Sequence, residues 1–356
     1  MANLGVASVV SFWRGRRVLV TGHTGFKGSW LSEWLLELGA DVAGLALPPE
    51  PHQLLFGQLK LSERMDHTFI DIRDADSLAR RVVNVQPEVV FHMAASPLVL
   101  ASYDDPISTW ATNVQGSLHL MQALRALDRP CAAVMITTDK VYENREWIHP
   151  YRENDRLGGS DPYSSSKAAM EIAIAAWRHS FFQDHPVRLV SVRAGNVIGG
   201  GDWAENRIVP DIVRALQTDE KIKVRHPDAV RPFQHVLEPL SGYLRLATRM
   251  LTEPEHLANA YNFGPQSCDV KTVSALVEIA LQTWPGQWVN QPVRRARHEA
   301  GLLNLGTELA RNDLGYAPRW DSTEGIVRTM QWYRAVHEGA DPIAQTQNQI
   351  REFGAP

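Results

Sequence analysis

Short, uninterrupted apolar runs alternate with longer segments of helical periodicity through the first half of this chain. The first run covers residues 17–21 (Arg-Val-Leu-Val-Thr) and ends directly at Gly22. Apolar residues at 26–38 then recur at helical spacing, and Gly39 follows them as a stop signal. A fully apolar run is typical of a parallel strand that is covered by helices on both faces. The alternation therefore predicts an α/β fold, a doubly wound parallel sheet of the Rossmann type.

The later segments continue this alternation as far as about Val197. We expect further strands at residues 42–47, 68–70, 89–92, 132–137 and 187–192, and helices at 75–85, 106–127 and 162–182. Beyond a loop that begins at Gly199, the pattern loosens, and helices are expected at 209–217, 237–251, 273–283 and 323–337.

This order of elements suggests two domains. We expect residues 1–197 to form a dinucleotide-binding Rossmann domain, to which a segment near 232–262 returns. Residues 198–340 are expected to form mainly a smaller mixed α/β domain that binds the substrate. Residues 341–356 are polar, so we expect a poorly ordered tail there.

Composition excludes several classes of function. With 356 residues, 44% of them apolar, the chain can bury a large core, and its net charge of −4 gives no reason to expect nucleic acid as a partner. No apolar run reaches the ~20 residues of a membrane span, and the apolar patch at 6–12 lacks the basic segment of a signal peptide. The two cysteines suggest neither a disulfide framework nor a metal site. We therefore expect a cytoplasmic protein with no metal, no membrane segment and no nucleic-acid partner.

The turn after the first predicted strand has the spacing of a dinucleotide-binding loop. Gly22, Gly25 and Gly28 follow a strand and open a helix, which is the context in which this spacing is informative. Glycines let the backbone approach a pyrophosphate, and the unpaired N–H groups at the start of a helix attract its charge. The alternative is a tight turn that binds no ligand.

The ends of the next two strands bear on the choice of cofactor. The second strand ends at residues 45–47 (Leu-Ala-Leu), without the acid that binds the ribose of NAD or the arginine that accommodates NADP. This position therefore leaves the choice between the two cofactors open. Asp71 and Ile72, after the third strand, would flank the adenine in such a fold.

Tyr163 and Lys167 stand four residues apart in a predicted helix, so they share one face of it. A nearby ammonium favours the phenolate, and we expect it to lower the tyrosine pKa from its usual value of ~10. Tyr163 could then take the proton of a sugar hydroxyl while hydride leaves the same carbon for nicotinamide. Thr138 is placed to hydrogen-bond that hydroxyl. A surface pair without function is the alternative.

Asp139 and Lys140 exceed what a simple dehydrogenase needs. Once a ketone has formed, the neighbouring C–H becomes acidic, so a base can remove its proton while an acid protonates the departing hydroxyl. We expect Asp139 to be this acid, held protonated by a partly apolar site. Lys140 would be the base, provided that burial or Lys167 lowers its pKa. A solvated pair on a loop is the alternative.

Five segments of the chain resemble the extended short-chain dehydrogenase/reductase superfamily and, within it, the nucleotide-sugar 4,6-dehydratases, most nearly those that act on CDP-glucose. These segments are residues 20–31, 138–142, 161–167, 193–203 and 231–239, and their most specific parts are the glycine turn and the Asp139-Lys140 pair. The resemblance implies a redox-neutral cycle on bound NAD. In this cycle hydride leaves C4 of the glucosyl unit, water is lost across C5 and C6, and hydride returns to C6.

The resemblance also implies roles for individual residues. It gives catalytic roles to Thr138, Asp139, Lys140, Tyr163 and Lys167. It places NAD against Gly22, Thr24, Gly25, Phe26, Lys27, Gly28, Asp71, Ile72, Ala94, Ala95, Asn113, Tyr163 and Lys167. It places a nucleotide-diphosphate hexose against Ser96, Asn196, Trp203, Arg207 and Arg231. It further implies a homodimer through a four-helix contact of the helices at 106–127 and 162–182.

The chain departs from the family pattern at Ser96, at Phe233 and at 306–309, where glutamine, tryptophan and Asp-x-x-Lys are usual. These departures leave the chemistry in place and the identity of the nucleotide and sugar open. Two other functions remain. An epimerase or reductase of the same fold would need no acid–base pair, and a nucleotide-sensing protein without catalysis would not need Tyr163 and Lys167.

Overall fold

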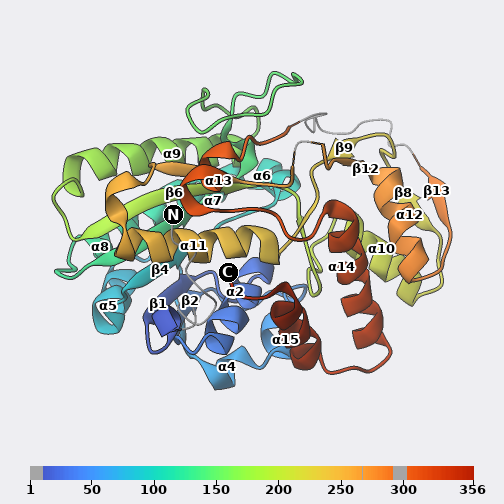
Figure 1. Cartoon of the computed structure of the whole chain (residues 1–356), viewed down its shortest axis with the longest axis horizontal. Helices are drawn as coiled ribbons and strands as arrows, with labels where there is room; N and C mark the ends of the chain where they lie inside the picture. The colour runs from blue at the N-terminus through green and yellow to red at the C-terminus, as the bar shows by residue number, and fades with distance from the viewer. Residues whose placement is uncertain (1–10, 267, 292–302) are drawn as a thin grey trace.

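A seven-stranded parallel sheet forms the centre of the computed structural model, which describes residues 11–266, 268–291 and 303–356 (Figure 1). The strand order is β11-β6-β5-β4-β1-β2-β3, and every neighbouring pair is parallel. The strands are β1 (Arg17–Thr21), β2 (Asp41–Ala46), β3 (Asp66–Phe69), β4 (Val89–His92), β5 (Cys131–Ile136), β6 (Val187–Ala194) and β11 (Ala260–Phe263). The strand order reverses beside β1, as in other doubly wound sheets, so the predicted fold class is confirmed.

Helices cover both faces of the sheet because its central strands are apolar on both sides. In β1, Val18 and Val20 pack into one core with α2 (Phe26–Glu37) and α11 (Leu237–Thr252). Leu19, between them, packs into the opposite core with α5 (Ala75–Val85), α8 (Ser117–Leu124) and α9 (Pro162–Phe181). This alternation follows from the two-residue period of a strand.

A second group of elements lies at one end of the sheet and includes α10 (Ile208–Gln217), α12 (Val273–Thr283) and α14 (Ser322–His337) (Figure 1). Three two-stranded sheets accompany these helices. They pair β8 (Ile222–Val224) with β13 (Trp288–Asn290), β9 (Val230–Arg231) with β12 (Lys271–Thr272), and β7 (Val197–Ile198) with β10 (Gln234–His235). The proposed division of the chain into two domains stays a prediction.

The helix predicted at 106–127 is wrong in its continuity. The chain instead forms α7 (Pro106–Trp110), a π-helical turn η1 (Ala111–Gly116) and α8. A π-helical turn commonly marks a functional position in a helix. Shorter elements not predicted are α3 (Leu55–Gln58), α4 (Leu61–Arg64), α6 (Val99–Asp104), η2 (Asp139–Val141), η3 (Pro254–His256) and α13 (Glu308–Leu314).

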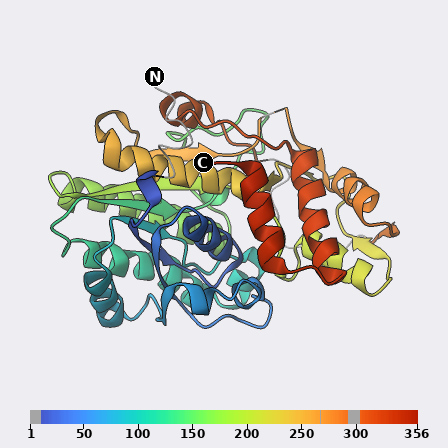
Figure 2. The same cartoon turned by 60° about the horizontal axis from the view of Figure 1, so that its bottom comes forward.

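The expectation of a poorly ordered C-terminal tail is also wrong. Residues 342–353 form α15 (Pro342–Phe353), which lies beside α14 (Figure 2). Ile350 and Phe353 are buried in the core shared with α2, and Gln347 donates a hydrogen bond to the buried Glu33 of α2 (2.9 Å). Thr346, Gln347 and Gln349 of this segment make tertiary hydrogen bonds, which composition does not reveal. No helix in the described ranges is long and apolar enough to cross a membrane.

Candidate active site

One large cavity of about 1870 Å³ opens at the carboxyl ends of the parallel strands and extends to the second group of elements. Ligands of open α/β sheets bind at this edge. The cavity is lined by nearly all of the predicted site residues: Gly22, Thr24, Gly25, Phe26, Lys27, Gly28, Asp71, Ile72, Ala94, Ala95, Ser96, Thr138, Asp139, Lys140, Tyr163, Lys167, Asn196, Trp203, Arg207 and Arg231. The fold therefore brings together segments that are far apart in the sequence.

The glycine turn is built as a cradle for an anion. A Cβ atom on Gly28 would lie 2.2 Å from the carbonyl oxygen of Gly22, so only glycine allows this close approach. Helix α2 starts after Gly25 with neither a side-chain cap nor an acidic residue in its first turn. Its first N–H groups are therefore free to bind a diphosphate at the cavity wall. These features fit a dinucleotide.

One residue that lines the cavity beside Asp71 was not among the predicted site residues. Arg73 lines the cavity beside Asp71 and Ile72, and its guanidinium binds the Asp71 carboxylate at 2.6 Å. The hydrogen bond from Arg73 is the main cause that lowers the pKa of Asp71. The carboxylate is therefore held in one orientation at this end of the cavity. The sequence signal for this ion pair was an arginine, Arg73, two residues after an aspartate, Asp71.

Asn113 differs from the other predicted site residues, because its fully buried side chain does not line the cavity. It lies in the π-helical turn η1 and binds the backbone of Ser96 through both amide atoms, at 2.8 and 3.1 Å. Its amide nitrogen also donates to the Ser166 hydroxyl at 2.9 Å. Asn113 therefore ties the Ser96 segment to the helix of Tyr163 and Lys167, where we had expected a contact with the cofactor.

Tyr163 and Lys167 both point from the first turns of α9 into the cavity wall, as their spacing predicts. The helix begins with a capping aspartate, Asp161, which accepts a hydrogen bond from the Ser164 amide at 2.8 Å. Lys167 Nζ donates to the carbonyl oxygen of Ile136 at 3.2 Å. Burial lowers the pKa of Lys167 to about 8, although the Glu171 carboxylate opposes this shift.

The expectation of a lowered tyrosine pKa is wrong for this structure. Burial raises the pKa of Tyr163 above its usual value, and the opposing effects of the Lys140 ammonium and of a Thr138 hydrogen bond are smaller. The ammonium acting most strongly on the phenol is therefore Lys140, rather than Lys167 as the spacing suggested. A side chain from a separate loop decides the result, and helical periodicity cannot reveal it.

Asp139 and Lys140 lie in the short 3₁₀ helix η2 directly after β5. The Asp139 carboxylate accepts hydrogen bonds from the Thr138 hydroxyl at 2.9 Å and from Lys140 Nζ at 3.3 Å. A Cβ atom on Gly195 would lie 2.0 Å from Asp139 Oδ2, so this glycine makes room for the carboxylate. Burial lowers the pKa of Lys140, but Asp139 and Tyr163 together outweigh burial, and the net pKa is raised. The condition stated for Lys140 as the base, a pKa lowered by burial or by Lys167, is therefore not met.

A buried ion pair behind these residues was not predicted. Glu171 accepts two hydrogen bonds from the Arg193 guanidinium, both at 2.9 Å. It also accepts from the hydroxyls of Thr137 (2.6 Å) and Ser191 (2.7 Å), so both carboxylate oxygens are fully used. Arg193 in turn donates to the Tyr142 hydroxyl at 2.7 Å. The pair connects the ends of β5 and β6 with α9 directly beneath the catalytic loop.

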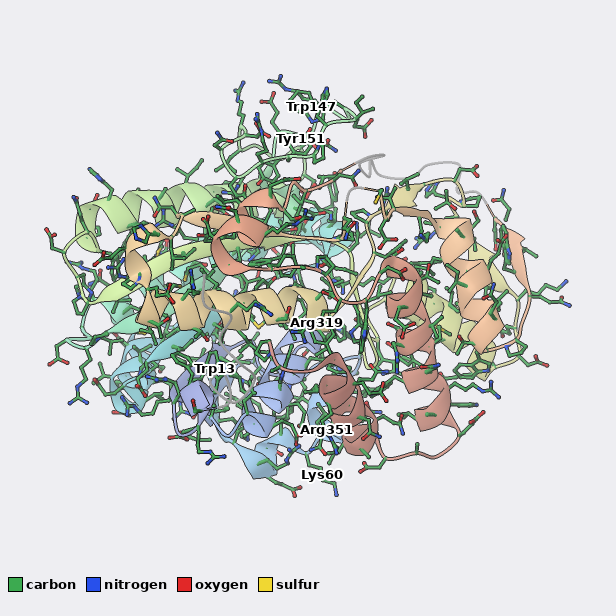
Figure 3. All side chains as sticks on the ribbon, in the orientation of Figure 1. Trp13, Lys60, Trp147, Tyr151, Arg319 and Arg351 are labelled. Carbon is green, nitrogen blue, oxygen red and sulfur yellow. The ribbon has the colours of Figure 1, made fainter. Side chains whose placement is uncertain are left out.

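The loop after η2 continues this network outward. Tyr151 stacks on Tyr142 with ring centroids 5.1 Å apart, and Trp147 packs on Tyr151 at 5.5 Å. Figure 3 shows Trp147 and Tyr151 on the loop that projects beyond the sheet edge. Residues 143–146 of this loop line the cavity.

The predicted substrate residues come from several loops and share the other half of the cavity. Arg207 binds Asp202 at 2.9 Å, which fixes its guanidinium at the cavity wall. Asn196 adopts a left-handed backbone conformation, with φ of 39°, at the turn after β6. The indole of Trp203 packs edge-on against Tyr333, and its buried N–H has no hydrogen-bond partner within the described residues.

The glycine turn, the open helix start and the Tyr–Lys helix in one cavity define a dinucleotide-dependent enzyme of the Rossmann class. The chain belongs to the NAD dependent epimerase/dehydratase family, whose family model matches residues 18–264. Membership of this family confirms the resemblance seen in the sequence and establishes NAD as the cofactor.

Two curated relatives show how the chain compares with individual members. It is 45% identical over 354 residues to the CDP-glucose 4,6-dehydratase of Salmonella typhimurium strain LT2, which covers 96% of this chain and 97% of that protein. It is 24% identical to dTDP-glucose 4,6-dehydratase 1 of Escherichia coli K12, over 92% of this chain and 95% of that protein.

Solved structures support the fold. DesIV, a dTDP-glucose 4,6-dehydratase from Streptomyces venezuelae with NAD and TYD bound, superposes with a TM-score of 0.77 at 24% identity, over 92% of this chain and 99% of that chain. A UDP-glucose-4-epimerase from Stenotrophomonas maltophila with bound NAD gives a TM-score of 0.78 at 21% identity, over 91% and 100%. At these identities the similarity concerns the fold.

Gly195→Ala should test the packing around Asp139. The added methyl group would displace the Asp139 carboxylate, and a displacement of about 1 Å at a catalytic group costs on the order of 100-fold in rate. Gly57→Ala is the matched control, because a Cβ there meets no atom within 4 Å. We expect kcat to fall about 100-fold for the first variant and to stay unchanged for the second, measured beside a thermal melt. Equal turnover in both variants would contradict the assigned geometry.

Proposed function

We propose that this protein is a nucleotide-sugar 4,6-dehydratase that converts CDP-glucose to the 4-keto-6-deoxy sugar. The observation that carries the proposal is the Asp139–Lys140 pair, which shares one cavity with Tyr163 and Thr138. A dehydrogenation alone needs only the tyrosine, the lysine of the same helix and the threonine. The 45% identity extends over 97% of the Salmonella CDP-glucose 4,6-dehydratase, and this extent supports CDP-glucose as the substrate.

In the first step Tyr163 takes the proton of the C4 hydroxyl, while Thr138 holds that hydroxyl by a hydrogen bond. Bound NAD supplies the chemistry of accepting the C4 hydride and later returning it to C6. Lys167 is buried in the same wall, and we propose that it orients the ribose next to the nicotinamide. The positive charges of Lys140 and Arg207 oppose the effect of burial on Tyr163 and so favour its phenolate.

The raised pKa of Lys140 is compatible with a role as base because Asp139 lies 3.3 Å away. Moving one proton from the ammonium to the carboxylate gives a neutral amine and a carboxylic acid. The amine can then remove the C5 proton, and the acid can protonate the C6 hydroxyl as it leaves as water. Elimination returns both side chains to their charged forms, and the Lys140 ammonium can then give a proton back to C5 when hydride returns to C6.

The substrate diphosphate would be held by Arg207 and Arg231, with Asn196 as a further donor. Guanidinium groups suit a diphosphate because they donate charge-assisted hydrogen bonds in a planar fork. Trp203 and Ser96 would contact the remaining parts of the nucleotide sugar. Arg207 is already fixed by Asp202, so little conformational freedom is lost when the diphosphate binds.

An epimerase of the same fold is the alternative, since several structural neighbours carry that name. An epimerase needs hydride transfer at C4 but no loss of water, and it would leave Asp139 and Lys140 without a task. The orientation of both groups toward the same cavity as Tyr163 favours the dehydratase.

We also propose a cytoplasmic homodimer. Both cysteines are unpaired, which suits a reducing compartment. Large apolar side chains are exposed on the adjacent helices α7 and α9, where Ile107 is 79% and Ile172 is 61% exposed, with Trp110 and Phe181 nearby in sequence. Exposed apolar side chains on neighbouring helices are typical of an interaction site, and a two-fold contact would bury them in a four-helix bundle.

A panel of nucleotide sugars tests the substrate. Purified protein with NAD should form a 4-keto product from CDP-glucose with the highest kcat/KM, compared with the dTDP-, UDP- and GDP-hexoses, measured by the absorbance of the product in alkali. A preference for another nucleotide would replace CDP in the proposal. Formation of a C4 epimer without a keto product would favour the epimerase.

Asp139→Asn tests the elimination step. The amide keeps the shape of the side chain but can neither accept the Lys140 proton nor donate an acid proton. We expect water loss to fall at least about 100-fold, while reduced cofactor still forms on mixing with substrate and accumulates, as seen by its absorbance. Asp155→Asn is the control, because this aspartate lies outside the cavity and binds Arg152. Unchanged product formation by Asp139→Asn would refute the role of the carboxylate.

Ile172→Glu tests the dimer contact. A charge in place of this exposed apolar side chain should make the protein monomeric in light scattering at micromolar concentration, because an unpaired carboxylate buried in the contact is strongly unfavourable. Val83→Glu, at an exposed apolar position on α5, should leave the mass unchanged. A wild-type protein that is already monomeric would overturn the proposed dimer.

A further inference from the structure

Lys27 lies where a positive charge is unfavourable unless an anion is bound beside it. It is the second residue of α2, and this helix begins with no side-chain cap and no acidic residue in its first turn. The positive end of the helix dipole therefore faces the same region as the ammonium. The side chain is half-buried and lines the large cavity.

The contacts of Lys27 within the protein leave its charge largely uncompensated. Its Nζ atom donates to the hydroxyl of Tyr243 at 3.1 Å and lies 5.2 Å from the centre of that ring. Tyr243 is fully buried in α11, and burial raises the pKa of its phenol, so this partner is neutral. Asp139 is the nearby carboxylate that favours the ammonium, but its hydrogen bonds go to Thr138 and Lys140.

Two further cations act on the same ammonium from other elements. Burial, then Lys167 of α9 and Arg207 before α10, lower the pKa of Lys27 to about 7, against the smaller effect of Asp139. Four elements thus place charged or polar groups around this amine. Two cations and one carboxylate act on it, and Arg207 is itself paired with Asp202 at 2.9 Å. Such an arrangement is relieved by a group with more than one negative charge.

We propose that the Lys27 ammonium, oriented by Tyr243, is a charge contact for the diphosphate of the bound dinucleotide, in addition to the backbone N–H groups of the glycine turn. Lys27 belongs to that turn, between Gly25 and Gly28, and this placement favours the cofactor diphosphate over that of the substrate. Arg207 and Arg231 serve the substrate half of the cavity. The inference rests on the NAD-dependence of the family and does not require CDP-glucose to be the substrate.

The contact makes cofactor binding depend on pH. Only the protonated amine attracts the diphosphate, and the bound anion raises the pKa of Lys27 above its value of about 7 in the free protein. Affinity is therefore full below pH 7 and falls as the pH rises above it. At pH 8 the binding of NAD should take up protons from the buffer.

Calorimetric titration of NAD and of ADP-ribose into the full-length protein tests the contact. Lys27→Met should weaken both ligands about tenfold or more at pH 7, the effect of losing one charge-assisted hydrogen bond. ADP-ribose lacks nicotinamide, so an equal loss for both ligands places the contact at the diphosphate. Lys221→Met is the matched control, since this exposed lysine does not line the cavity.

Proton uptake gives a second readout that a merely structural role would not change. Titrations at pH 8 in buffers of different ionisation enthalpy should show uptake for the wild type and for Lys221→Met, and none for Lys27→Met. The melting temperature of ligand-free Lys27→Met should equal or exceed that of the wild type, which shows that the variant folds. An NAD affinity within twofold of the wild type, with uptake retained, would overturn the inference. A loss confined to CDP binding would also overturn it, because Lys27 would then serve the substrate diphosphate.

Discussion

The buried ion pair of Glu171 and Arg193 is the interaction on which the geometry of the site depends. Removing two charges from water is costly, and a buried pair is tolerated only when every remaining donor and acceptor is satisfied. Here the hydroxyls of Thr137 and Ser191 complete the carboxylate, and Tyr142 takes a further guanidinium N–H. The pair therefore has one well-defined arrangement, and it fixes the ends of β5 and β6 against α9. Thr138 and the acid–base pair follow directly on Thr137, so their positions are inherited from this buried network.

Above the ion pair, the cavity is governed by the balance of charge. Lys27, Lys140, Lys167 and Arg207 influence one another or the catalytic tyrosine. Three carboxylates oppose these four cations: Asp139 at their centre, Asp202 bound to Arg207, and Glu171 acting on Lys167. A site with this surplus of positive charge is suited to two diphosphates, one from the cofactor and one from the substrate. The pKa directions described above apply to the protein before either diphosphate is bound. Binding of an anion should raise the pKa of each of these amines and so favour its protonated form.

The sequence was sufficient for the architecture because the signals there are local and repeated. An apolar run such as 17–21 followed by a glycine turn and a helix permits few folds, and the carboxyl ends of the strands must meet at one edge. Asp71, Thr138 and Asn196 closely follow β3, β5 and β6, and they line one cavity, as this rule requires. The C-terminal helix was missed for a physical reason. Its polar Gln347 donates a hydrogen bond to Glu33, a partner far away in the sequence, whereas composition alone suggested contact with solvent.

The pKa directions of the catalytic residues could not be predicted from spacing, since each is a small difference between large opposing effects. For Tyr163 the spacing pointed to Lys167, but that ammonium is held at the Ile136 carbonyl, and Lys140 from another loop acts on the phenol instead. For Lys140 the largest effect that opposes burial comes from its own sequence neighbour, Asp139, and Tyr163 adds to it, so the net pKa is raised. Helix α9 connects the buried ion pair with the charges in the cavity. Tyr163, Lys167 and Glu171 follow one another at intervals of four residues, so a single stripe of the helix carries the phenol, the amine and the carboxylate. The last of these lies in the buried ion pair, and through it the rigid core of the sheet sets both the position of Lys167 and the degree to which its amine keeps a proton.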